Sequence, residues 1–150
     1  MLVATIIAAF SLLFLLGWFR YSCGLILSAR PARDYTPQVA EANALAVLAV
    51  QQDLPLAGER RVLNTLRHKL KRDYHLLNYL LDHSPAIHAG NEIFEQRMMM
   101  LDFELMQAYY LLVSLLSRSK SRAALHEMTQ VICYFANTMG ERGAWSPLTE

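Results

Sequence analysis

Residues 59–82, ERRVLNTLRHKLKRDYHLLNYLLD, decide the fold class. Their apolar residues recur every three or four positions, which is the period of a helix with one buried face. The stripe comprises Leu63, Leu66, Leu70, Tyr74, Leu77 and Leu81. The spacing therefore predicts a helix over residues 59–82 that packs through this stripe.

Three further segments show helical patterns. Residues 92–117 are apolar around most of the helix circumference, and residues 121–139 begin at a serine and end before Gly140, a helix stop. Thr36 and Pro37 form a good helix start for residues 37–52, where several alanines allow close approach of a neighbour and predict the central helix. No stretch alternates cleanly with period two. We therefore predict an all-α, four-helix-bundle-like domain over residues 37–140, followed by a tail over 141–150.

The helical stripes also predict the core of this domain. Large apolar residues at the centre of a stripe are expected to be buried, because they face the other helices. The residues expected to be buried are Leu66, Leu70, Leu77, Leu105, Leu112, Met128 and Phe135.

The N-terminal segment is expected to cross a membrane. Residues 2–19 carry no charge, and a helix of this length covers roughly 27 Å, close to the hydrocarbon thickness of a bilayer. Trp18 and Arg20 resemble the aromatic and basic belt at a membrane surface. A cleaved signal would need a basic n-region and a shorter apolar core. We therefore predict a single transmembrane helix with its juxtamembrane segment over residues 1–29 and a linker over 30–36.

The charged residues predict the orientation of this helix. All fourteen Lys and Arg residues and all thirteen Asp and Glu residues follow Phe19. The first charged residues, Arg20, Arg30 and Arg33, lie on the C-terminal side of the span, and basic residues hold their side of a span in the cytoplasm. We expect a single-pass inner (plasma) membrane protein with its N-terminus outside and its helical domain in the cytoplasm.

Metal-binding and catalytic motifs are not found in the sequence. The two cysteines, Cys23 and Cys133, are too few for a disulfide framework, and no two histidines have the spacing of a helical metal site. Phosphate-binding glycine loops, nucleophile elbows and C-x-x-C pairs do not occur. The sequence predicts no enzyme activity, no metal and no cofactor.

Two Arg–His pairs leave an alternative open. Arg72 with His75, or Arg122 with His126, could supply a phosphate-binding cation and a general acid or base. An anchored effector acting on RNA or on the bilayer is therefore the alternative function. Generic pairs of this kind are also typical of a solvated helix face.

A cluster of positive charge marks a candidate docking face. It consists of Arg60, Arg61, Arg67, Lys69, Lys71 and Arg72. Such a face could bind anionic lipid or a protein partner, or it could be an ordinary solvated face. Binding of nucleic acid is less favoured, because the stretch has no stacking aromatics and the chain has a net charge of only +1.

Residues 98–112, MMMLDFELMQAYYLL, mark a candidate interface. Their Met and Tyr side chains point in every direction around a helix, and both types are adaptable interface residues. The candidate residues are Met98, Met99, Met100, Tyr109 and Tyr110. A protein partner or a second copy could cover them, or this segment could be a helix enclosed by the other three.

Two stretches resemble a known family. ALAVLAVQQDLPLAGERRVLNTL is similar to the first helix, acidic loop and second helix of tellurite-resistance-type (TerB-like) domains, and LLVSLLSRSKSRAALHEMTQVICYFANTMG resembles their later helices. The loop of this chain contains Asp53 and Glu59. Some members of that group are single-span membrane proteins with a cytoplasmic domain. The resemblance implies a helical scaffold that works by contact, such as an accessory or regulatory subunit of an envelope-associated complex.

Overall fold

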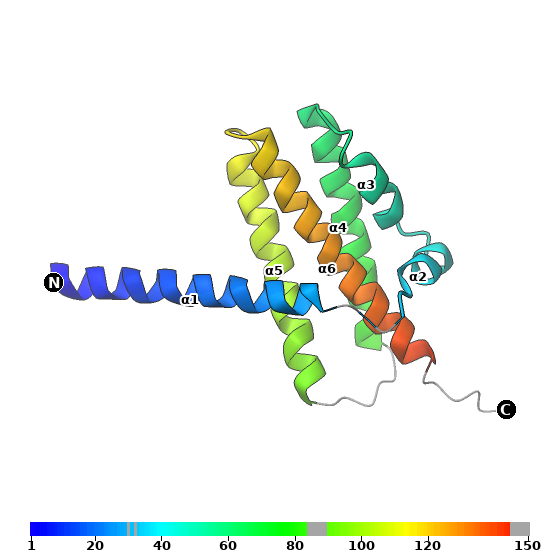
Figure 1. Cartoon of the computed structure of the whole chain (residues 1–150), viewed down its shortest axis with the longest axis horizontal. Coiled ribbons are helices and arrows are strands. Elements are labelled where there is room, and N and C mark those ends of the chain that lie inside the picture. Colours follow the sequence, from blue (N-terminus) through cyan, green and yellow to red (C-terminus); the bar gives the residue numbers. More distant parts are fainter. Residues whose placement is uncertain (30, 32, 84–89, 145–150) are drawn as a thin grey trace. The chain divides into compact units, whose positions relative to one another are not determined.

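The structure is a computed structural model of the chain, and it describes all residues except 30, 32, 84–89 and 145–150. The described residues form six helices (Figure 1). The chain divides into two compact units, Met1–Arg30 and Pro31–Glu150. The all-α class predicted from the sequence is confirmed.

The first unit contains the helix α1, Leu2–Ser28. It is long and apolar enough to cross a membrane. Two of its hydroxyl groups are satisfied within the helix: Thr5 Oγ1 donates to the carbonyl of Met1 at 3.1 Å, and Ser22 Oγ donates to that of Trp18 at 3.0 Å. The hydroxyls of Thr5 and Ser22 therefore add little cost to placing α1 in an apolar medium.

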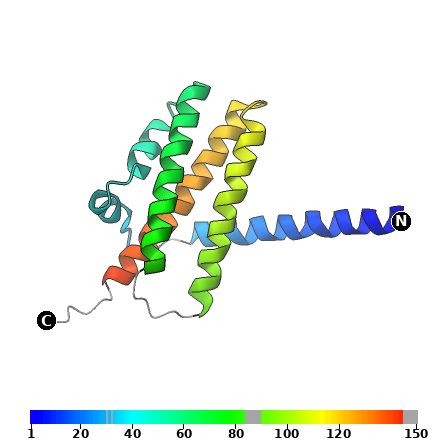
Figure 2. The same cartoon turned by 180° about the vertical axis from the view of Figure 1, so that it is seen from behind.

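The second unit contains three long helices and two short ones. The long helices are α4, Arg60–His83, α5, Gly90–Val113, and α6, Arg118–Ala144. The short helices are α2, Thr36–Ala42, and α3, Val47–Asp53. The long helices run up and down beside one another, as both views show (Figures 1 and 2).

The helix predicted over residues 37–52 is wrong in one respect, because it is broken into α2 and α3. Ala44 lies in the break with a φ of 50°, in the left-handed region that a non-glycine residue seldom adopts. The predicted start is also shifted. Tyr35 precedes the first turn, and the Asp34 carboxylate accepts the Thr36 N–H at 2.9 Å. The fourth position of the predicted bundle is thus filled by two short helices.

The central helix is α6, and not the segment 37–52 that the alanine pattern favoured. It packs against α2, α3, α4 and α5. Its core residues Leu125, Met128, Val131, Ile132 and Phe135 are fully buried. The side chains of three aromatic residues join the long helices: the Tyr74 ring stacks on Phe103 at 4.0 Å between centroids, and it lies 6.1 Å from Phe135.

The end of α6 also differs from the prediction. Gly140 does not stop the helix, which continues to Ala144, so the predicted tail begins inside α6 and its last part, 145–150, lies outside the described residues. A Cβ atom at Gly140 would overlap the side chain of Tyr35. The glycine therefore allows the segment before α2 to lie directly against α6. Beside it, the Asn137 Oδ1 atom accepts the Tyr35 N–H at 2.6 Å.

Candidate docking surfaces

The six basic residues predicted as a docking face do not share one side of α4. At about 100° per residue, Arg60, Arg67 and Lys71 lie within about 40° of one another, whereas Arg61 and Arg72 point elsewhere and Lys69 lies on the opposite flank of the buried stripe. Arg60, Arg61, Lys71 and Arg72 are exposed, and Arg67 and Lys69 are half-buried. The cluster is therefore split among several directions.

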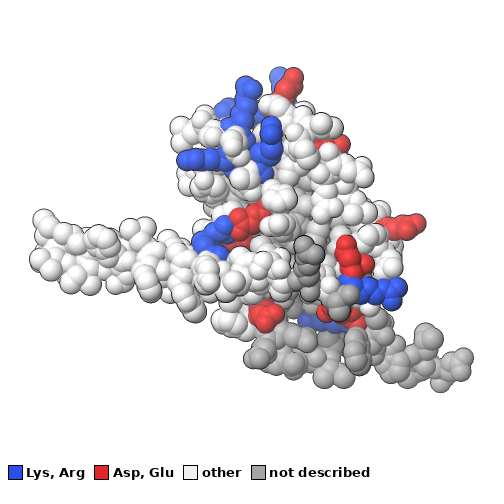
Figure 3. Space-filling view, viewed as in Figure 1, with Lys and Arg blue, Asp and Glu red and all other residues white. Residues whose placement is uncertain are grey.

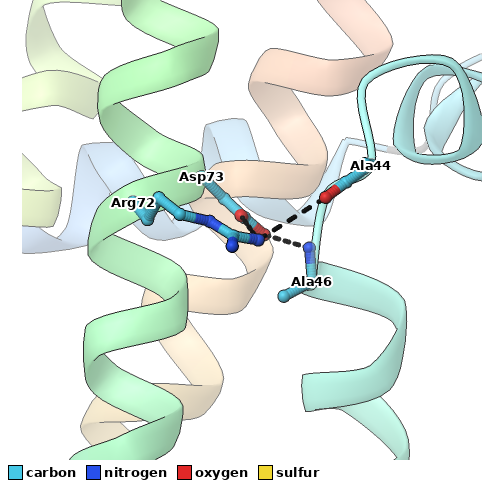
Figure 4. A network of polar contacts seen from close by, with 4 residues as sticks. All are labelled: Ala44, Ala46, Arg72 and Asp73. Atoms are coloured by element: carbon cyan, nitrogen blue, oxygen red, sulfur yellow. Dashed lines mark hydrogen bonds and ion pairs between the residues drawn. The ribbon is translucent and has the colours of Figure 1, made fainter.

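Arg72 takes part in a contact that holds the short helices (Figure 4). Its Nη2 atom lies 3.4 Å from Asp73 Oδ1 and 3.5 Å from the carbonyl oxygen of Ala44. Asp73 is fully buried, and its Oδ2 atom accepts the Ala46 N–H at 2.6 Å. The carboxylate of α4 thus satisfies an N–H group at the start of α3, where a helix has no partner of its own.

Burial controls the ionisation of Asp73. Loss of solvation raises the pKa of this carboxyl above its ordinary value of 3.8, while the Ala46 N–H and the Arg72 guanidinium act in the opposite direction. Sequence reasoning missed this residue because its hydrogen bond to Ala46 joins it to a segment 27 residues away in the sequence. One signal was available: at about 100° per residue, Asp73 lies only about 20° from Leu66 on the helix wheel, at the edge of the apolar stripe.

Arg122 occupies a comparable position on α6. Its Nη2 atom donates to the carbonyl of Ala57 at 2.8 Å, which fixes the α3–α4 connection against the first turns of α6. The two arginines of the alternative Arg–His pairs are therefore engaged with backbone carbonyls. Their partners, His75 and His126, are exposed, and His126 Nε2 lies 3.4 Å from Gln130 Nε2.

Metal-ligating side chains do not gather in the described part of the chain. No group of three or more His, Cys, Asp or Glu residues there could hold a metal ion. Asp53 and Glu59 of the loop between α3 and α4 are both exposed. His88 lies outside the described residues.

The predicted interface residues of α5 divide between core and surface. Met99 and Tyr110 are buried in the bundle, Met98 and Met100 are half-buried, and Tyr109 is 37% exposed. Arg67 covers the Tyr110 ring, with its guanidinium carbon 5.6 Å from the centroid. Only part of the predicted set is therefore accessible.

A different set of α5 residues forms an exposed apolar face. Phe94 is 65% exposed, Leu101 62% and Leu112 70%, so the prediction that Leu112 is buried is wrong, and Leu105, also predicted to be buried, is only half-buried. The half-buried Met98 and Leu105 lie between them, so the five residues follow spacings of four, three, four and seven, with Ala108 at the intervening position. We call Phe94, Met98, Leu101, Leu105 and Leu112 the α5 face. Its spacing is that of the a and d positions of a heptad, which suits packing against another helix.

A second surface lies at the end of the unit where α4 and α6 begin and α5 ends. Figure 3 shows basic side chains gathered at this upper end. Arg60, Arg61, Arg118 and Lys120 are exposed there. The turn between α5 and α6 adds Leu115 and Leu116, which are 72% and 85% exposed. We call these six residues the basic tip.

Contacts within the unit confirm that these parts of the chain meet. The Arg122–Ala57 hydrogen bond joins the segment before α4 to α6. Burial raises the pKa of the Tyr110 hydroxyl, and the charges of Arg67 and Arg60 act in the opposite direction, so the start of α4 also lies near the end of α5. The basic tip is thus one surface built from the starts of α4 and α6 and the turn between α5 and α6.

Comparisons with known proteins add no relative to this description. No family model, no curated protein and no solved structure matches the chain. The resemblance to TerB-like domains stays a prediction.

Proposed function

We propose that the protein is a membrane-anchored accessory or regulatory subunit that binds a protein partner in an envelope-associated complex. In this proposal α1 spans the inner membrane with its N-terminus outside, and the unit from Pro31 onward lies in the cytoplasm. The length and composition of α1 and the positions of Arg20, Arg30 and Arg33 support this topology.

The observation that carries the proposal is the α5 face. Monomeric soluble domains rarely leave a continuous apolar stripe of this length uncovered, and such stripes mark interaction sites. The stripe follows a heptad spacing over about five helical turns, so a helix of a partner protein is the occupant that fits it.

The charges beside the α5 face also favour a protein over a lipid surface. Glu95, Arg97 and Glu104 are exposed along α5. An anionic bilayer would be repelled by two of these three side chains. A partner helix with charges of both signs can pair with all of them.

Site-specific photocrosslinking in native membranes tests the proposal. A photoreactive residue in place of Leu101 should give a defined crosslinked product, and the same residue in place of the exposed Lys71 should not. Leu101→Glu, combined with the photoreactive residue at position 94, should remove the product while helix content stays unchanged. Identical products from positions 71 and 101 would refute the α5 face as the docking site.

Two measurements test the anchor separately. The protein should remain with membranes during alkaline carbonate extraction, and residues 1–19 should remain on the mature chain. A chain whose N-terminus begins near residue 30 would show that the helix is removed and would refute the anchored form.

A further inference from the structure

The basic tip combines charge and exposed leucines in a way that the proposed partner site does not use. Residues 54–61 and 111–122, which build this end of the unit, contain five basic residues and one acidic residue, Glu59. The rest of the chain contains nine basic and twelve acidic residues. The net charge of the protein is nearly neutral, but this end of the unit is positively charged and the rest of the chain is negatively charged.

Helix orientation adds to the positive potential of the tip. Both α4 and α6 begin at this end and α5 ends there, so two positive helix ends and one negative end leave a net positive contribution beside Arg60 and Arg118. The α6 start is closed by Ser117, whose Oγ atom accepts the Lys120 N–H at 3.4 Å. Such a surface attracts both small anions and extended anionic surfaces or polymers.

The leucines restrict the kind of anion. Leu115 and Leu116 occupy the turn that connects α5 to α6, and Leu56 in the α3–α4 connection is 86% exposed. A single-stranded nucleic acid is less well matched, because its binding surfaces stack bases on aromatic rings, and residues 54–61 and 111–122 contain none. A bilayer offers phosphates to the basic residues. It also offers acyl chains to the leucines, at a depth that a single leucine side chain can reach.

The geometry points to an anionic phospholipid bilayer as the ligand of the basic tip. Leu115 and Leu116 insert at the boundary between headgroups and acyl chains, and Arg60, Arg61, Arg118 and Lys120 bind lipid phosphates around them. This binding is separate from the anchor α1 and from the α5 face, so it requires neither of them.

The test uses the full chain held in nanodiscs of phosphatidylcholine, so that the bilayer around the protein is uncharged. These nanodiscs are mixed with sucrose-loaded vesicles and sedimented. The protein should sediment with vesicles that contain phosphatidylglycerol and not with vesicles of phosphatidylcholine alone. Added salt should weaken the association, because exposed charges are screened.

Matched variants assign the binding to the tip. Arg118→Ser with Lys120→Ser should weaken vesicle binding roughly thirtyfold, given about 1 kcal/mol for each basic residue near an anionic surface. Lys69→Ser with Lys71→Ser removes the same charge from α4 away from the tip and should change binding less than threefold or so. An equal loss from both pairs would refute a localised site.

Variants of the two leucines distinguish binding to a bilayer from binding to other polyanions. Leu115→Ser with Leu116→Ser should weaken vesicle binding at least roughly tenfold, whereas Leu101→Ser on the α5 face should not. Heparin provides the contrasting probe, because it carries charge without acyl chains. Unchanged vesicle binding by the leucine pair, together with equally tight heparin binding, would overturn the proposal in favour of a purely electrostatic site for acidic polymers.

Discussion

Asp73 on α4 accepts the backbone N–H of Ala46 at 2.6 Å, across 27 residues of chain. This bond, together with the Arg72 contact to the Ala44 carbonyl, holds the break between α2 and α3 against the bundle. A buried carboxylate therefore decides where the N-terminal half of the predicted long helix ends and a new helix begins.

Replacement of Asp73 tests this role. Asp73→Ala should lower the free energy of unfolding by about 1–2 kcal/mol near neutral pH, because the Ala46 N–H loses its acceptor. Asp73→Asn keeps an acceptor oxygen and should cost less. Chemical denaturation of the full chain in detergent measures both, and equal losses from the two variants would contradict the capping role.

The pH dependence of the same pair has a defined sign. Burial raises the pKa of Asp73 in the folded chain above 3.8, so the folded state holds this proton more tightly than the unfolded state. The resulting stabilisation is complete below pH 3.8 and is lost as the pH rises through the folded-state pKa. The stability of the wild type relative to Asp73→Asn should therefore fall across that window, measured by denaturation at several pH values. A rise would contradict the raised pKa.

Two glycines of α6 form a matched pair of positions. Gly140→Ala should destabilise the unit by roughly 1–3 kcal/mol, because the new methyl group would overlap Tyr35. Gly143→Ala meets open space and should stabilise the helix by roughly 0.5–1 kcal/mol. Thermal unfolding followed by circular dichroism distinguishes them. Equal shifts in the same direction would show that Tyr35 does not lie against Gly140.

The exposed and buried leucines predict a second contrast. Leu70→Ala should cost about 2–5 kcal/mol, because Leu70 is fully buried and its removal leaves a cavity. Leu112→Ala should cost about 0.5 kcal/mol or less, since this side chain is 70% exposed. Urea denaturation of the full chain compares the two. A large loss from Leu112→Ala would place that residue in the core after all.

Cys133 should react slowly with alkylating reagents. Burial raises the pKa of this thiol to about 11, and Gln51 Nε2 lies 3.2 Å from its sulfur. Because only the thiolate is nucleophilic, alkylation by iodoacetamide should be slow at pH 7 and should accelerate up to about pH 11. A Cys23→Ser background leaves one thiol to report, with glutathione as the reference. A rate equal to that of glutathione at pH 7 would refute the raised pKa.

The sequence predicts the helices whose pattern is local, and the structure shows why the others differ. The stripe of α4 is narrow, so Leu63, Leu70 and Leu77 can face only one way, and all three are buried. The α5 segment is apolar on all sides, so its pattern cannot indicate which side meets α6. Met99 faces the core and Leu112 does not, because their orientation depends on tertiary packing.

The candidate surfaces follow the same distinction. Sequence analysis identified the positive charge of α4 but could not bring Arg60 and Arg118 to one end of the unit, since that requires the path of α5 between them. The break at Ala44 has neither proline nor glycine to mark it. The break depends on the carboxylate of Asp73, 29 residues further along the chain. Local helix propensity cannot predict a contact between residues so far apart in the sequence.

The contact of Tyr35 with α6 has a mechanical consequence. The backbone of Tyr35 is hydrogen-bonded to Asn137, and its side chain lies against Gly140. A force that pulls on the chain before residue 35 therefore acts on α6 near the C-terminal end of that helix. Arg118, at the start of α6, lies about 28 Å from Asn137 along the helix axis. Because α6 packs against α2, α3, α4 and α5, this force is shared among all four helices. The unit should therefore resist the force as one body before α2 detaches from α6.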